Sequence, residues 1–259
     1  MSKDILLDYL SRILEKSGEH LSRFILIGGY ASLLYNLKME EEPPVFTTDL
    51  DLLMEETNET DRVLEEKLKE LKFEIEISKR GETKFRNHTW KENQGIDFEI
   101  EFLIPKIGHE NREHKNKSYG ITPQSLRFLD ILLENCWSFD FKGGKKIKIP
   151  HPARYLIQKL LSYERRKEKQ KRENDIRYIA NIIDLFSDED RITILTTEIN
   201  QIFNTPRRKW IKKAVNNYEK LFLRDPSPGI EILLKYSTPQ IIDRAKYQAE
   251  FFLEHLQIK

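Results

Sequence analysis

The chain has 259 residues, of which 44 are basic and 43 acidic, so its formal net charge of +1 neither favours nor excludes a nucleic-acid partner. Hydrophobic residues make up 39% of the sequence, enough for the core of one large domain or two small ones. One cysteine excludes an intrachain disulfide and a cysteine-based metal site, and the absence of a signal peptide or a long apolar run predicts a cytoplasmic protein without membrane spans.

The first part of the chain alternates between helical and strand patterns. Apolar spacing predicts a helix over 4–17 and, after a short buried strand over 24–27, a second helix over 30–37. Acidic and apolar residues alternate over 49–54, as in a strand with one polar face. The elements expected next are a helix over 58–71, a strand over 73–78, a strand or turn over 84–90 and a strict period-two strand over 96–103.

The next elements end the mixed part of the chain, and from residue 152 the pattern changes to helices alone. We expect a loop over 109–120, a helix over 123–137 and a hairpin over 139–149 that turns at Gly143-Gly144. Helical patterns follow over 152–170, 173–187, 190–203, 206–221, 229–236 and 238–256. The sequence therefore predicts an α+β fold, with a mixed sheet and helices in residues 1–150 and an all-helical domain in residues 151–259.

Two glycines and two aspartates suggest one site. Gly28 and Gly29 end the first strand and open a helix, where backbone N–H groups and the helix dipole favour a phosphate. Asp49 and Asp51 share one face of the next strand, about 7 Å apart at Cα. Two like charges so placed favour a bound cation, and Mg²⁺ or Mn²⁺ prefers such oxygen ligands.

A later strand offers a third carboxylate. Asp97, Glu99 and Glu101 alternate with apolar residues, and any of them completes the site if the two acidic strands are neighbours. A phosphate cradle beside an acidic metal site implies a nucleoside triphosphate. The chemistry expected is nucleotidyl transfer at the α-phosphorus. Taken singly, Asp97 and Glu99 are better explained as a solvated sheet face.

The order of these motifs resembles the DNA polymerase β-type nucleotidyltransferase superfamily. The matching stretches are ILIGGYA at 25–31, TTDLDL at 47–52 and IEFLIP at 100–105. More narrowly, the chain resembles bacterial nucleotidyltransferase-like proteins, which SLRFLD at 125–130 and PARYLIQKL at 152–160 also match. Two positions depart from the pattern: Phe46 replaces an arginine, and the last acid is Glu101 instead of an aspartate.

The resemblance implies specific roles. Residues 1–150 would be the catalytic domain, and 151–259 a helical domain that binds nucleotide or acceptor. The resemblance selects Glu101 over Glu99 as the third carboxylate. The implied catalytic and metal-binding residues are Asp49, Asp51 and Glu101, and the implied nucleotide-binding residues are Gly28, Gly29, Thr48 and Lys159.

The resemblance also implies partners. An NTP such as ATP would supply the nucleotide, and tRNA, another RNA or a protein would supply the acceptor hydroxyl. Many small relatives in the superfamily are toxins or phage-defence components, so an antitoxin or a second copy of the chain is an expected partner. The competing hypothesis is a nucleotide-binding or interaction module that keeps the fold without turnover.

Two basic clusters lie in the helical part. Lys159 and Arg166 are seven residues apart, so we expect them on one helical face, with Lys159 set among apolar residues. The second cluster combines Arg207, Arg208, Lys209, Lys212 and Lys213 with Trp210. It could hold an RNA backbone, although a helix start with surface lysines explains it equally well.

Overall fold

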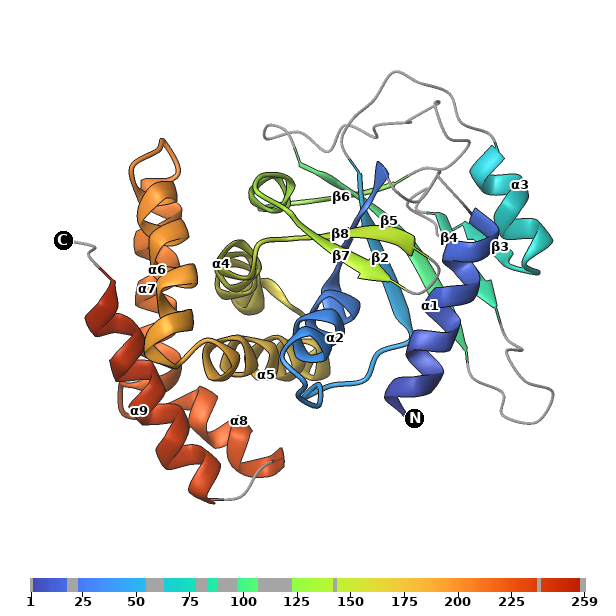
Figure 1. Ribbon diagram of the computed structural model, residues 1–259. Coiled ribbons are helices and arrows are strands. Elements are labelled where there is room, and N and C mark those ends of the chain that lie inside the picture. The colour runs from blue at the N-terminus through green and yellow to red at the C-terminus, as the bar shows by residue number, and fades with distance from the viewer. Residues whose placement is uncertain are drawn as a thin grey trace. The chain divides into compact units, whose positions relative to one another are not determined.

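The computed structural model describes residues 2–17, 23–54, 63–77, 83–87, 97–106, 123–141, 144–236 and 239–256. Contacts between Cα atoms divide the chain into two compact units, Met1–Pro150 and His151–Lys259 (Figure 1). Sheet and helices mix in the first unit, whereas the described part of the second contains helices and no strand. The fold class is therefore α+β.

One mixed sheet organises the first unit. Its described strands follow the order β3-β4-β5-β2-β1-β8-β7, and β6 pairs with the end of β5. The acidic strand β2 is central, antiparallel to β1 and parallel to β5. The strands are β1 Ile25–Ile27, β2 Asp49–Leu53, β3 Glu74–Ile77, β4 Thr83–Asn87, β5 Phe98–Pro105, β6 Gln124–Leu126, β7 Trp137–Phe141 and β8 Lys145–Ile149.

Among the described residues of the first unit, three α-helices accompany this sheet: α1 (Lys3–Ser17), α2 (Gly28–Lys38) and α3 (Val63–Glu70). Helix α2 follows β1 directly and contacts both β1 and β2, as Figure 1 shows. Its Ala31 and Leu34 are fully buried, as are Leu50 of β2 and Ile100 of β5. The apolar sides of these elements thus form the core that fixes the polar face of β2.

The described part of the second unit is a bundle around α4 (Pro152–Ser162). Residues 152–161 are all buried, as expected for a helix surrounded by others, and α4 contacts α5, α6 and α7. The remaining helices are α5 Lys169–Leu185, α6 Glu189–Phe203, α7 Arg208–Phe222, α8 Pro228–Tyr236 and α9 Pro239–His255.

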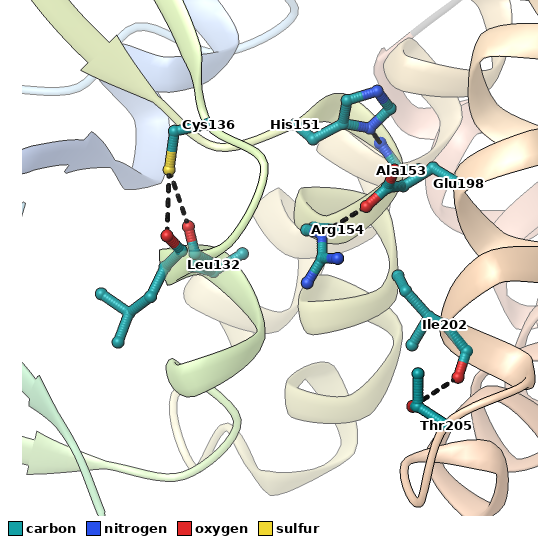
Figure 2. Close-up of polar contacts among 9 residues, drawn as sticks. Leu132, Cys136, His151, Ala153, Arg154, Glu198, Ile202 and Thr205 are labelled. Atoms are coloured by element: carbon teal, nitrogen blue, oxygen red, sulfur yellow. Dashed lines mark hydrogen bonds and ion pairs between the residues drawn. The ribbon is translucent and has the colours of Figure 1, made fainter.

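The helix expected over 123–137 is wrong. The segment contains β6, a short 3-10 helix at Asp130–Leu133 and the first residue of β7. Phe128 (φ 66°) and Asn135 (φ 52°) adopt left-handed backbone angles, which interrupt a right-handed helix. Cys136 lies in the turn that follows, where its thiol donates to the Leu132 carbonyl at 3.2 Å (Figure 2).

The single helix expected over 152–170 is also wrong, because α4 ends at Ser162. A 3-10 turn, Tyr163–Arg165, and an extended Arg166 (ψ 119°) separate α4 from α5. The other predicted helices and the hairpin of β7 and β8 are present within a few residues of the expected bounds. The predicted elements at 58–62, 78, 88–90, 96 and 109–120 lie outside the described residues.

None of the helices that the structure describes has the length and apolar character needed to cross a bilayer.

Candidate active site

Strand pairing brings the predicted carboxylates together. In the parallel pair of β2 and β5, Asp49 stands opposite Glu99 and Asp51 opposite Glu101. Side chains at paired positions of neighbouring strands project to the same face of a sheet. All four are half-buried, whereas Leu50 between the aspartates is fully buried. Four carboxylates therefore share one sheet face, with Glu99 and Glu101 on the strand beside the aspartate pair.

Gly28 allows Asp51 to approach the start of α2. Strand β1 pairs Ile27 with Asp51, so the next residue, Gly28, lies beside the aspartate side chain. A Cβ built on Gly28 would lie 3.0 Å from Cγ of Asp51 and would overlap its Oδ2. Gly28 also has a φ of +65°, which side-chain-bearing residues adopt at a cost. This position thus requires glycine for two independent reasons.

The start of α2 carries no negative side chain of its own. Ile27 is the N-cap residue and makes no side-chain cap hydrogen bond, and the first turn contains no acidic residue. The first N–H groups of a helix have no partner within the helix and carry partial positive charge. Because Gly28 and Gly29 are the first residues of α2, no side chain of theirs blocks access to this end of the helix.

Thr47 and Thr48 fix the approach to β2. The Asp49 amide donates to the Thr47 hydroxyl at 3.1 Å, and the Glu99 amide donates to the Thr48 carbonyl at 3.1 Å. The second bond extends the β2–β5 ladder by one residue before Asp49. Thr48 is thus placed beside the carboxylate face by its backbone, and its side chain is half-buried.

A buried tyrosine beside this face was missed by sequence reasoning. Tyr30, the third residue of α2, is fully buried, and its hydroxyl makes no hydrogen bond with any described residue. Burial, and then the negative charge of Asp49, raise the pKa of Tyr30 well above its usual value, so the hydroxyl keeps its proton. The available signal was a tyrosine directly after Gly28-Gly29.

Lys159 occupies a separate, buried environment in the second unit. Its ammonium lies 2.6 Å from Asp175 of α5, whose other oxygen accepts from Arg166 at 2.9 Å. Lys159 also lies over the rings of Tyr155 and Tyr178. Burial alone would raise the pKa of Asp175, but Lys159 and Arg166 lower it below the ordinary value. Both cations expected on one helical face thus converge on one carboxylate instead.

A second buried ion pair supports the start of α4. Arg154 donates through Nε to Glu198 of α6 at 2.5 Å, and both side chains are less than 10% exposed. Beside them, His151 caps α4 because its Nδ1 accepts from the Ala153 amide at 3.3 Å (Figure 2). Burial lowers the pKa of His151 against the opposing effect of Glu198, with Arg154 adding to the lowering.

The carboxylate face is the place at which the chain would hold a metal ion. Within the described residues, no three His, Cys, Asp or Glu side chains are gathered as a complete metal site. The donor set nevertheless suits a hard cation, because Mg²⁺ is commonly held by one or two carboxylates together with substrate phosphates and waters. The pair Asp49 and Asp51 meets that requirement.

Comparisons with known proteins gave a match to a family model and a match among solved structures. A family model described as nucleotidyltransferase matches residues 9–202. Among solved structures, the chain is similar to an antigenic nucleotidyltransferase-like protein from Paracoccidioides brasiliensis, with 20% sequence identity and a TM-score of 0.48 over 82% of this chain and 94% of that one. No curated protein sequence matches significantly. Because the family model covers three quarters of the sequence, the chain belongs to this nucleotidyltransferase family.

Proposed function

We propose that the chain is a metal-dependent enzyme that transfers a nucleoside monophosphate from an NTP to a hydroxyl acceptor. Family membership supports the general reaction. One observation carries the proposal for this chain: Asp49 and Asp51 share a sheet face with Glu99 and Glu101, directly beside the start of α2.

Asp49 and Asp51 are the proposed ligands of Mg²⁺ or Mn²⁺. A cation there would offset the repulsion between neighbouring carboxylates, and the triphosphate would supply the remaining ligands. When bound, the metal would neutralise phosphate charge and make the attacking hydroxyl more acidic.

The phosphates would lie against the start of α2. Backbone N–H groups of Gly28 and Gly29 donate to phosphate oxygens in this proposal, as helix N-termini do for anions. The lack of a side chain at Gly28 lets Asp51 approach the same place. Thr48, which precedes Asp49 and is held beside β5 by its backbone, is the further proposed nucleotide contact.

A carboxylate of β5 would accept the proton. As the acceptor oxygen forms its bond to the α-phosphorus, its proton passes to Glu101, and the bond between the α-phosphorus and the bridging oxygen breaks. Pyrophosphate leaves with that electron pair. Glu101 stands opposite Asp51 and is the proposed base, while Glu99, opposite Asp49, is the alternative. Glu101→Gln and Glu99→Gln, compared at saturating NTP, would show which one limits kcat.

Lys159 is the proposed cationic contact to the triphosphate, but its surroundings already give it a structural role. The ammonium is buried and paired with Asp175. Lys159→Arg, which keeps the charge, separates the two roles. If Lys159 binds the nucleotide, we expect this variant to have a higher KM for NTP and an unfolding free energy close to the wild-type value.

Transfer can be measured directly with each α-labelled NTP, Mg²⁺ or Mn²⁺, and total RNA or a protein extract. We expect label on an acceptor with the wild-type chain and none with Asp49→Asn/Asp51→Asn. The matched control is Asp140→Asn, a change of the same chemistry on the 80%-exposed side chain of β7. Equal labelling by the double variant would overturn the proposal.

The acceptor decides the biological role. Gel separation would show whether the label is on RNA or on protein and so identify the acceptor. We propose a toxin or defence role, with an antitoxin as partner, for a chain that modifies such an acceptor. Binding of NTP without transfer to any acceptor would instead support the non-catalytic module.

A further inference from the structure

Five basic residues gather at the start of α7. We call Arg207, Arg208, Lys209, Lys212 and Lys213 the α7 basic patch. Arg207 is half-buried, and the other four are exposed. Lys209 and Lys212 have no acidic partner within the described residues, while Lys213 lies 3.8 Å from Glu164 in an exposed pair. The carboxylate face described above uses none of these cations.

Helix electrostatics do not explain the patch. The N-terminal end of a helix carries partial positive charge, so each cation in the first turn is unfavourable for folding. The first turn of α7 has no acidic residue, and Arg207, its N-cap, makes no side-chain cap hydrogen bond. The sequence thus places Arg208 and Lys209, beside Arg207, where folding alone disfavours positive charge, which points to an anionic ligand.

Aromatic rings lie among these cations. The Arg208 guanidinium is 4.4 Å from the ring centroid of Phe203, and Lys212 lies 6.0 Å from the same centroid. Arg207 lies 6.0 Å from the centroid of Trp210, which is half-buried. Cations interleaved with aromatic faces are the combination that single-stranded nucleic acids use, because phosphates meet the charges and bases stack on the rings.

The charge of the whole unit points the same way. Residues 151–259 contain 21 basic and 15 acidic residues, a net charge of +6, whereas residues 1–150 contain 23 and 28, a net charge of −5. The neutral balance of the full chain therefore hides two units of opposite sign. Such an asymmetry is typical of a chain with one nucleic-acid-binding part.

We propose that the α7 basic patch binds the phosphodiester backbone of a single-stranded nucleic acid and that Trp210 stacks on one of its bases. The inference rests on the proposed function only where it makes the bound strand the nucleotide acceptor. Binding itself requires neither Asp49 nor Asp51.

The test compares two pairs of exposed lysines in the full-length protein. Fluorescence anisotropy with a 5′-labelled 12-nucleotide RNA, in EDTA and without NTP, would measure the affinity. We expect Lys209→Glu/Lys212→Glu to bind at least about tenfold more weakly in 50 mM salt. Lys220→Glu/Lys246→Glu changes the charge equally at two exposed lysines outside the patch and is expected to change the affinity by less than about threefold.

Two further readouts distinguish binding from folding. Lys209→Glu places a negative charge in the first turn of α7, so the patch variant is expected to unfold at about the same temperature as the wild type. Five phosphate contacts give a slope of about −3.5 for log K against log salt, and loss of two reduces it by about 1.4. Trp210→Leu should weaken binding about fivefold without changing this slope.

Several outcomes would overturn the inference. Equal losses in both lysine pairs would show non-specific attraction to the whole unit. Equal affinity for poly-glutamate of the same charge would show an acidic protein segment as the ligand. Self-association that Lys209→Glu/Lys212→Glu abolishes would show that a second copy covers the patch. Because the binding assay contains no metal and no NTP, a negative result in it says nothing about nucleotidyl transfer. A negative result in the transfer assay likewise says nothing about binding at the α7 basic patch.

Discussion

The Asp51 carboxylate lies directly against Gly28, so that a methyl group on this glycine would lie 3.0 Å from Cγ and overlap Oδ2. The pairing of Ile27 with Asp51 produces this approach, because the chain turns into α2 at the residue after Ile27. One contact therefore joins the first glycine of the motif to the second aspartate, and the start of the helix to the carboxylate face.

Gly28→Ala is expected to destabilise the protein by more than a positive φ alone explains. An alanine at left-handed angles costs about 1–2 kcal/mol, and here the displacement of Asp51 adds to that cost. Gly144→Ala is the control, since Gly144 has a φ of +73° and nothing within 4 Å of a built Cβ. Urea denaturation would measure the loss of unfolding free energy in both variants, and the difference between them is the cost of the overlap with Asp51. Equal losses in the two variants would contradict this prediction.

Metal binding should be visible as a gain in stability before any turnover. A ligand that binds only the folded state stabilises it by about 2.7 kcal/mol at one hundred times its Kd. We expect Mn²⁺ to raise the melting temperature of the wild-type chain and not that of Asp49→Asn/Asp51→Asn. Asp140→Asn should respond like the wild type, and a response of the double variant equal to the wild type would place the metal elsewhere.

Tyr30→Phe is expected to leave the stability unchanged or to raise it slightly. The buried hydroxyl of Tyr30 makes no hydrogen bond with the residues that the structure describes, so its removal breaks none of them. Tyr35→Phe, in the same helix, removes a buried hydroxyl that donates to the Pro150 carbonyl at 2.7 Å. That loss should cost about 1–3 kcal/mol by urea denaturation, because it leaves the Pro150 carbonyl buried without this donor.

If Tyr30→Phe also weakens Mn²⁺ or NTP binding, the hydroxyl has a place in the site as well as in the core. A loss of stability as large as that of Tyr35→Phe would instead show that the Tyr30 hydroxyl has a structural partner.

The carboxylate face could be predicted because its signal is local. Alternation of acid and apolar residues gives the strands of Asp51 and Glu101 and the face each residue occupies. The pairing of these two strands, with Asp51 opposite Glu101, depends on contacts between segments that are distant in the sequence. The sequence pattern alone does not predict which strands are neighbours.

Residues 123–137 show the opposite case. Their apolar spacing suits a helix, but Phe128 and Asn135 adopt left-handed angles and Gln124–Leu126 pairs with the end of β5. The periodicity of apolar residues predicts neither the backbone angles of these two residues nor the pairing of this strand. The apolar neighbours of Lys159 in the sequence indicate that it is buried, which the structure confirms, but they do not indicate its pairing with Asp175, which comes from another helix.

Asp175→Asn should be among the most destabilising single changes in the helical unit. It leaves Lys159 buried without its carboxylate, and breaking one partner of a buried pair costs about 3–5 kcal/mol. Thermal denaturation would measure the loss, with Asp140→Asn as the exposed control. Because the pKa of Asp175 is lowered in the folded state, its contribution is present above the usual value of 3.8 and is lost as the pH falls below it. A variant as stable as the wild type would contradict the pair.

His151 should make the helical unit less stable as the pH falls below neutrality. Burial lowers the pKa of its ring in the folded state from the usual 6.5, so the unfolded chain binds a proton first. Stability is then complete above pH 6.5 and declines as the pH falls towards the lower, folded-state pKa. Protonation would also remove the Nδ1 lone pair that accepts from the Ala153 amide.

His151→Asn tests this because asparagine caps helices well and does not titrate. We expect the variant to lose the part of the decline between pH 7 and 5 that belongs to His151, while its unfolding free energy at pH 7 stays within about 1 kcal/mol of the wild-type value. His255, an exposed histidine in the last turn of α9, provides the control, and His255→Asn should keep the decline. An unchanged pH dependence in His151→Asn would show that the charge of Glu198, which favours the protonated ring, cancels the effect of burial, and a steeper decline would show that it outweighs burial.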